Sequence, residues 1–227
     1  MGEERMVVLA SSRKCGGYCL AGKTLAAAGH VGAWLRPVTG AGEDGLPRQR
    51  TLCTDGQPAA ILDVVTLDCG RPAPNLHQRE NQLMAAPALR RGGRVAWEDL
   101  PLLADQAASA LWIDGHSSLC GVNDRVPARR LSELAGSLLL LAVSELVLAR
   151  ESGYAGRIKY RADFRIAQRG YNLALTDSVA SSWLQGAHRL ALADAYLCVS
   201  LALPFQDGFA YKLAAAVITS ERAEGRR

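Results

Sequence analysis

The stretch of residues 157–166 constrains the fold more than any other, because polar and apolar residues alternate along it without a break. Successive side chains of a β-strand leave opposite faces, so the pattern predicts a strand with one buried and one solvated face. The predicted buried face carries Ile158, Tyr160, Ala162, Phe164 and Ile166, and the other carries Arg157, Lys159, Arg161, Asp163 and Arg165. A turn-like sequence follows at 168–170, and apolar alternation resumes at Tyr171, which predicts a β-hairpin.

The polar face of this hairpin is basic, with four cations and one carboxylate. A curved basic sheet face suits the phosphate backbone of a nucleic acid. The alternative is an ordinary solvated strand, because charged outer faces are common in antiparallel sheets. The net charge of +4 permits a polyanionic partner without requiring one.

The second half of the chain shows a regular order of predicted elements. Strands are predicted at 138–150, 157–167, 171–176, 195–203 and 209–219, and a helix at 178–187, capped by Ser178 and ended by Gly186. Five strands with a helix between the third and fourth is the order of the OB-fold, a five-stranded Greek-key barrel. The basic hairpin then forms strands two and three, where such barrels bind oligonucleotides.

The first half predicts a second small barrel. Short strands are expected at 6–10, 18–25, 30–38 and 61–67, separated by turn-rich segments, and a helix is expected at 100–112. Pro127 and a charged run mark a boundary within 127–136. The prediction is therefore a mainly β protein of two consecutive OB-like five-stranded barrels with short helices: residues 1–130, with long loop and helical insertions, and residues 131–227.

A P-loop pattern, GxxxxGK[ST], begins at Gly17 and ends at Thr24. A true P-loop wraps phosphates with backbone N–H groups at the start of a helix, so the match raises the alternative of an NTP-binding enzyme. Residues 18–21 instead alternate like a strand, and Gly29 would stop the following helix after a few residues. We therefore interpret the match as incidental.

The remaining candidates are polar and aromatic residues in loops and strands. A Gly-rich loop at 11–19 offers cations to phosphates, Trp34 offers a stacking surface or packs in the core, and the cluster at 77–81 reads base edges or makes interdomain hydrogen bonds. Arg125 pairs with Asp124 or with a phosphate. The predicted nucleic-acid-binding residues are Arg13, Lys14, Lys23, Trp34, Arg36, His77, Gln78, Asn81, Arg125, Arg157, Lys159, Arg161 and Arg165. We predict no catalytic residue, metal or cofactor, and we expect Tyr160 and Phe164 to be buried.

Several segments together resemble the prokaryotic family known as the dual OB-containing domain. They are residues 12–14 (SRK), 19–22 (CLAG), 34–38 (WLRPV), 62–64 (LDV), 77–81 (HQREN), 123–125 (NDR), 171–173 (YNL), 176–177 (TD) and 211–213 (YKL). The resemblance covers nearly the whole chain, and the sequence departs from it at Ser178, where a proline is expected. It implies two OB barrels, a nucleic-acid-binding role and a link with prokaryotic conflict or phage-defence systems.

The compartment is predicted to be the cytoplasm. The first five residues lack the pattern of a secretory signal, the longest apolar run, 138–143, is too short for a membrane span, and the six cysteines form no CxxC pair. The predicted function is non-catalytic binding of single-stranded or structured nucleic acid. The alternatives are a protein-interaction module built on the same barrels and, third, the NTP-binding enzyme.

Overall fold

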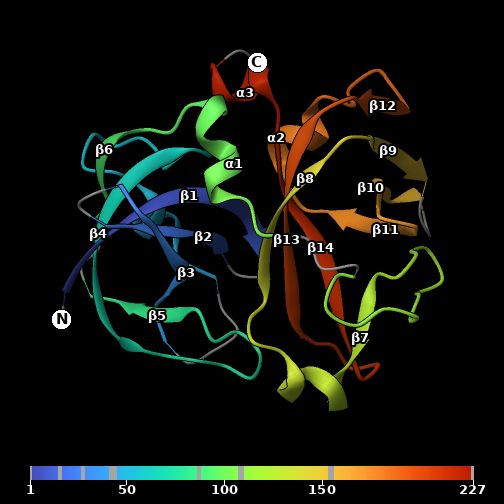
Figure 1. The fold of residues 1–227 in the computed structure, drawn as a ribbon, viewed down its shortest axis with the longest axis horizontal. Coiled ribbons are helices and arrows are strands. Elements are labelled where there is room, and N and C mark those ends of the chain that lie inside the picture. The colour runs from blue at the N-terminus through green and yellow to red at the C-terminus, as the bar shows by residue number, and fades with distance from the viewer. Residues whose placement is uncertain are drawn as a thin grey trace. The chain divides into compact units, whose positions relative to one another are not determined.

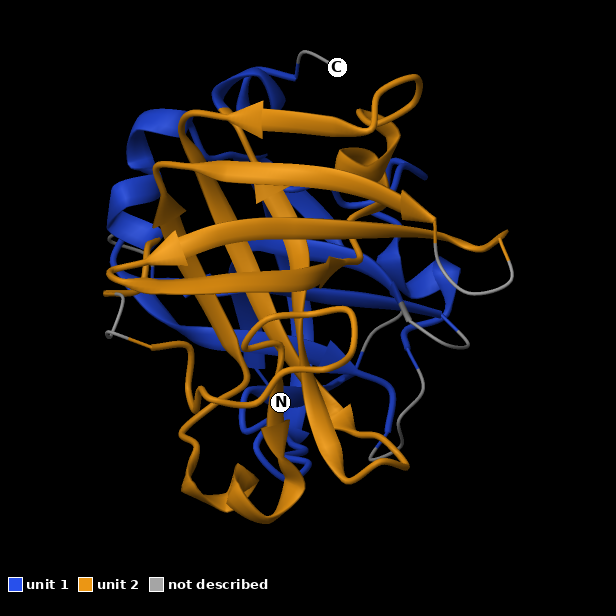
Figure 2. Cartoon of the chain, turned by 90° about the vertical axis from the view of Figure 1, so that its right-hand side faces the viewer, with its two compact units in different colours: residues 1–103, 220–227 blue, residues 104–219 orange. Residues whose placement is uncertain are grey.

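The computed structural model describes residues 2–14, 17–26, 29–40, 45–85, 88–106, 110–152 and 156–225, except the side chain of Lys14. The chain divides into two compact units (Figure 2). Unit 1 comprises residues 1–103 and 220–227, and unit 2 comprises residues 104–219. The division differs from the predicted boundary at 130/131, because Val126, which precedes that boundary, belongs to a hydrophobic cluster of unit 2 with Leu131 and Leu201.

Unit 1 is a six-stranded sheet with the strand order β1-β2-β3-β5-β4-β6 (Figure 1). A further pairing of β1 with β4 joins the ends of the five-stranded path. Strand β3 is parallel to β5, and the other pairs are antiparallel. The strands are β1 (Gly2–Lys14), β2 (Gly17–Leu25), β3 (Val31–Val38), β4 (Asp63–Pro72), β5 (Asn81–Met84) and β6 (Arg90–Arg94). The helices are η1 (Arg48–Thr51), η2 (Trp97–Asp99), α1 (Leu100–Leu103) and α3 (Ser220–Ala223).

Unit 2 repeats this arrangement in an eight-stranded sheet, β12-β9-β10-β11-β14-β13-β8, with β7 paired to β14. Its strands are β7 (Arg125–Pro127), β8 (Leu138–Val143), β9 (Leu146–Ser152), β10 (Ile158–Ile166), β11 (Arg169–Leu175), β12 (Arg189–Leu192), β13 (Ala195–Pro204) and β14 (Phe209–Ile218). Its helices are η3 (Ala128–Glu133) and α2 (Ser178–Ser182).

Both units have the OB strand order, and the mainly β prediction is confirmed. In each unit the third barrel strand runs parallel to the fifth, as β3 does to β5 and β11 to β14. The predicted strand 138–150 is two strands, interrupted at Ser144 and Glu145. The first part, β8, pairs with β13, while the second, β9, pairs with β10. Because of the interruption, consecutive parts of the chain pair with strands near opposite ends of the sheet.

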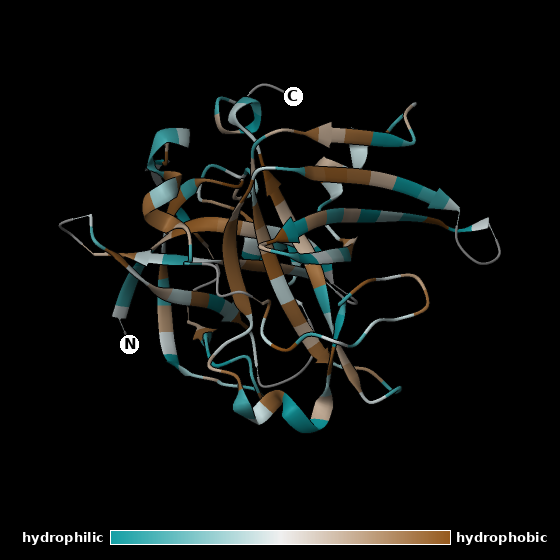
Figure 3. Cartoon of the chain, turned by 45° about the vertical axis from the view of Figure 1, so that its right-hand side comes forward, coloured by the Kyte–Doolittle hydropathy of each residue, from teal (hydrophilic) through white to brown (hydrophobic). Residues whose placement is uncertain are grey.

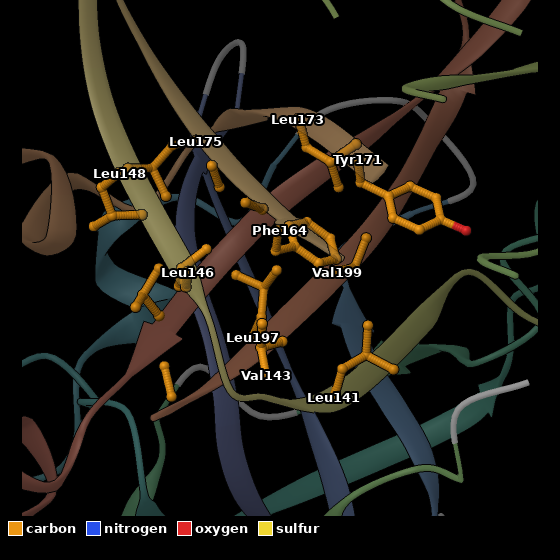
Figure 4. Close-up of a cluster of buried hydrophobic side chains, with 14 of the residues drawn as sticks. Leu141, Val143, Leu146, Leu148, Phe164, Tyr171, Leu173, Leu175, Leu197 and Val199 are labelled. Carbon is orange, nitrogen blue, oxygen red and sulfur yellow. The ribbon is translucent and has the colours of Figure 1, made fainter. Parts of the chain in front are cut away.

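Strand β10 shows why this sequence forms a barrel wall. Hydrophilic and hydrophobic residues follow one another along the strands at the right of Figure 3. Ala162, Phe164 and Ile166 are buried in the core of unit 2, as the alternation predicts. The rings of Phe164 and Tyr171 stack with centroids 5.3 Å apart, among the buried leucines and valines of Figure 4. Burying such a side chain contributes about 1.5–3 kcal/mol.

Two predicted helices are shorter than expected. The helix predicted at 100–112 is helical only over α1 in the described residues. Asp105 then exchanges hydrogen bonds with Leu140: its amide donates to the Leu140 carbonyl, and its carboxylate accepts from the Leu140 amide, both at 2.8 Å. Through these two hydrogen bonds, the chain at Asp105 lies against β8 as a neighbouring strand would. None of the helices in the described ranges is long and apolar enough to cross a membrane.

The helix predicted at 178–187 is α2, and its cap is Asp177 rather than Ser178. The carboxylate oxygen Oδ1 of Asp177 accepts from the amides of Val179 and Ala180, at 3.0 and 3.2 Å. Its Oδ2 accepts from the amide of Val217 on β14, at 2.9 Å. The capping side chain therefore also fastens the helix to the sheet.

The P-loop match lies in strand β2, which pairs with β1 and β3. A Cβ atom at Gly22 would lie 1.8 Å from the carbonyl oxygen of Val7, so glycine is required for the close approach of β1. The ammonium of Lys23 is buried 5.4 Å from the centroid of the Trp34 ring. A paired strand cannot cradle phosphates with its backbone as a P-loop does, so the structure favours the interpretation of this match as incidental.

Candidate nucleic-acid interface

Unit 2 contains an open groove of about 800 Å³ on the face of β10, β11 and β14. Its other wall comes from residues 114–125, which we call the cover segment. Ser118, Leu119 and Cys120 supply one side of the groove, and Lys159 and Tyr211 lie among the strand residues that line it. The groove therefore lies on the barrel strands that carry the predicted basic hairpin.

The groove exists because β11 and β14 pair over only two positions, Ala174 with Leu213 and Leu175 with Ala214. Before these positions the cover segment takes the place of the missing partner. Val122 exchanges two backbone hydrogen bonds with Asn172 on β11, at 3.0 and 3.2 Å. The following strand, β7, pairs with β14. The cover segment is thus held on both diverging strands.

Arg161 lies beneath the cover segment, which corrects its predicted role in tracking phosphates. Its side chain is 6% exposed and pairs with the carboxylate of Asp124 at 3.7 Å. Its guanidinium also donates to the side-chain and main-chain oxygens of Asn172, at 2.6 and 2.5 Å. Asp124 in turn accepts from the amide and hydroxyl of Ser118, at 2.7 and 2.6 Å. Arg161 therefore holds the wall of the groove in place.

A second buried pair, Lys212 with Asp114, fastens the start of the cover segment. The two groups are 2.7 Å apart, and their side chains are 0% and 5% exposed. Asp114 also accepts from the Tyr171 hydroxyl at 2.5 Å and from Arg169 at 3.0 Å. Burial lowers the pKa of Lys212, against the opposing effect of Asp114, and burial raises the pKa of the Tyr171 hydroxyl. The network fixes the segment that forms the groove.

The most exposed cation among the described residues that line the groove is Lys159, and apolar and aromatic groups surround it. Lys159 is exposed, and its ammonium lies 3.7 Å from the thiol sulfur of Cys120, which is also exposed. Leu119 is fully exposed and Ile158 about half exposed. Tyr160, which we expected to be buried, packs partly against the core but also lines the groove.

Arg125 lies at the groove with a partner other than the predicted Asp124. Its guanidinium pairs with Asp207 at 3.6 Å and lies 4.0 Å from the centroid of the Phe209 ring. Asp207 also accepts from the hydroxyl of Tyr211 at 2.5 Å, and this hydrogen bond lowers the pKa of the Asp207 carboxyl. The carboxylate therefore offsets much of the charge that Arg125 would offer to a phosphate.

The other predicted cations of the hairpin, Arg157 and Arg165, are exposed. Arg165 donates to the carbonyl of Gln168 at 2.9 Å, which leaves the rest of its guanidinium accessible. Two carboxylates share the outer face: Glu151 lies opposite Lys159 in the pairing with β9, and Asp163 lies along β10. The face is thus less basic than the sequence pattern suggests.

Most of the predicted residues of unit 1 are buried. Arg13 is exposed, whereas the side chain of Lys14 lies outside the described part of the chain. Trp34 is partly buried beside Lys23. Arg36 is 4% exposed and pairs with Glu80 at 3.2 Å, so it is internally neutralised.

The polar cluster at 77–81 forms part of this buried layer. His77, Gln78 and Asn81 are all buried. Asn81 donates to Gln78 at 3.4 Å and accepts from Arg36 at 3.4 Å, next to the parallel pairing of β3 with β5. Reading of base edges needs accessible donors and acceptors, so the geometry favours a structural role for the cluster.

The sequence did not identify Leu119, Cys120 or Tyr211 as groove residues. A leucine at position 119, within a polar stretch of the sequence, could have indicated an apolar contact site, and in the structure it is exposed. Tyr211 gives no such signal, because its place depends on where β11 and β14 separate.

Comparison with known proteins agrees with this architecture. The family model of the dual OB-containing domain matches residues 4–217, and no curated protein matches the chain. Several segments of the sequence resemblance, including Asp124, Asn172 and Lys212, belong to the hydrogen-bonded network that holds the cover segment. The match spans almost the whole chain and both units have the OB strand order, so the protein belongs to the family of dual OB-containing domains.

Proposed function

We propose that the protein binds nucleic acid without catalysis, and that the groove of unit 2 receives a single-stranded or locally unpaired segment. The observation that carries this proposal is an open groove on β10, β11 and β14 that combines an accessible cation, Lys159, with the aromatic Tyr160 and Tyr211. Proteins that bind single strands combine cationic grooves with aromatic side chains on which bases stack. OB barrels commonly bind oligonucleotides on this face.

The apolar rim favours unpaired bases over a duplex. Leu119 and Ile158 expose apolar surface at the groove, which is unfavourable in water unless a partner covers it. An unstacked base offers a flat apolar face, whereas a duplex keeps its base faces stacked inside. Arg157 and Arg165, exposed at the two ends of β10, are placed to meet phosphates on either side of such a segment.

Two finer expectations stay predictions. The family resemblance implies a link with prokaryotic conflict or phage-defence systems, and the residue pattern indicates the cytoplasm. A protein-interaction role remains the second function to test, because the exposed Leu119 and Ile158 would also suit an apolar partner surface.

The test is a fluorescence-anisotropy titration with single-stranded DNA, single-stranded RNA and duplex DNA at two salt concentrations. We expect salt-sensitive binding that favours a single strand. Replacing Arg157, Lys159 and Arg165 together by alanine should weaken it and reduce its salt dependence. Arg129→Ala, which removes an exposed cation of η3 outside the groove lining, is the matched control. Unchanged affinity in the triple variant would refute the proposal, and salt-insensitive capture of a protein would support the interaction module.

A further inference from the structure

Among the described residues that line the groove, Lys159 is the one cation without a carboxylate partner, since Arg125 pairs with Asp207. Arg161 and Lys212 line it but are buried against the carboxylates of Asp124 and Asp114. Lys159 is exposed, and within the described ranges it forms no ion pair; its side-chain contact is the sulfur of Cys120. The electrostatics of the groove therefore suit a single phosphate at Lys159.

Groups suited to bases lie on both sides of this cation. Ile158 and Tyr160, the neighbours of Lys159 in the chain, also line the groove, although their side chains leave the strand on its other face. Leu119 comes from the cover segment beside Cys120, and Tyr211 comes from β14. Base stacking on an aromatic side chain contributes about 1–3 kcal/mol, so apolar and aromatic groups around one cation match a base–phosphate–base unit.

The volume of the groove also indicates a ligand of about this size. Its volume of about 800 Å³ lies within the range of roughly 300–1,000 Å³ typical of sites for one small molecule. A longer strand would have to continue outside it, towards Arg157 or Arg165.

We propose that the minimal ligand of the unit 2 groove is a dinucleotide, with its bridging phosphate at Lys159 and its bases against Leu119 and Tyr211. This inference rests on the proposed function and adds the footprint, by which we mean the number of nucleotides that the groove holds. One phosphate contact gives a slope of about −0.7 in log K against log salt for a single-stranded ligand. A free dinucleotide and two adjacent nucleotides within a longer nucleic-acid strand offer the same chemistry.

Competition distinguishes these sources. A labelled single-stranded octanucleotide is bound to the full chain, and unlabelled adenylyl-adenosine or its deoxy equivalent is added. Adenosine alone and inorganic phosphate alone are the controls for one base and for one phosphate. We expect the dinucleotide to displace the octanucleotide, and the two controls to require at least tenfold higher concentrations. Site-resolved alkylation should show that the dinucleotide also protects Cys120.

Lys159→Gln should weaken dinucleotide binding about tenfold or more, and Leu119→Ser should weaken it without changing the salt slope. Arg129→Gln should leave it unchanged, and circular dichroism checks that each variant is folded. If the octanucleotide binds but the dinucleotide neither displaces it nor protects Cys120, the footprint is overturned and the proposed function stands. If no nucleic acid binds, both fall.

Discussion

Removing the carboxylate of Asp114 should destabilise unit 2 more than any exposed substitution. Asp114 is the anion beside the buried ammonium of Lys212, and it accepts from the hydroxyl of Tyr171. In Asp114→Ala, Lys212 must keep a buried charge without this anion or lose its proton. Either outcome raises the free energy of the folded state.

The magnitude follows from the burial of both partners. Removal of one member of a buried ion pair typically costs about 3–5 kcal/mol. The hydrogen bond from Tyr171 is part of the same network, so its loss is not added separately. Arg169 is half exposed, and its pairing with Asp114 contributes little because solvent screens it. We therefore expect Asp114→Ala to lower the free energy of unfolding by about 3–5 kcal/mol.

Urea denaturation followed by far-UV circular dichroism measures this loss. Asp194→Ala, at an exposed turn position, is the matched control and should change stability by less than about 0.5 kcal/mol. The double variant Asp114→Ala/Lys212→Met should recover part of the loss, because it removes the unpaired charge. A single variant as stable as the Asp194 control would refute the view that this pair fastens the cover segment.

Three further outcomes are expected. Burial raises the pKa of Tyr171, so this tyrosine ionises in the unfolded chain near pH 10, before it does so in the folded chain. Its contribution should lower the free energy of unfolding by up to about 1.4 kcal/mol per pH unit above that value. Alkaline urea titrations should show a shallower fall in Tyr171→Phe, in which the raised pKa values of Cys69, Tyr196 and Tyr211 still act. The lowered pKa of Lys212 acts oppositely, but only up to its ordinary value of about 10.4. Asp177→Ala should lose about 2–4 kcal/mol, from a helix cap and an unsatisfied buried amide, while Ser178→Ala loses little in the same denaturation assay. Gly22→Ala should cost at least about 1–3 kcal/mol in thermal unfolding, because its Cβ collides with the backbone of β1; wild-type stability would contradict the close packing.

The fold was largely predictable, because alternation along β10 and β11 directly reports which face is buried. The five-strand order of the second half was predicted for the same reason. Strand β12 was missed, since its four residues carry too short a pattern. The division after residue 103 was not predicted, because residues 104–130 join unit 2 through contacts such as Asp105 with Leu140, which no local pattern reports.

The candidate site was less predictable, because exposure of a charged side chain depends on what folds over it. Arg161 and Lys159 occupy equivalent places in the alternation, yet the cover segment buries only Arg161. Arg36 and His77 are buried in unit 1 for a similar reason, as parts of a polar layer beside β3 and β5. A sequence shows where charges lie along a strand, whereas their partners come from segments far away in the chain.

The most direct test of the central claim is the alkylation rate of Cys120, measured by peptide mass spectrometry with and without a bound single-stranded oligonucleotide. Cys120 is exposed and lines the groove beside Lys159, so an occupied groove should slow its alkylation several-fold. We predict this protection at oligonucleotide concentrations that saturate binding, and its loss when salt releases the strand. An unchanged rate while the oligonucleotide is bound would contradict the account and place the nucleic-acid interface elsewhere.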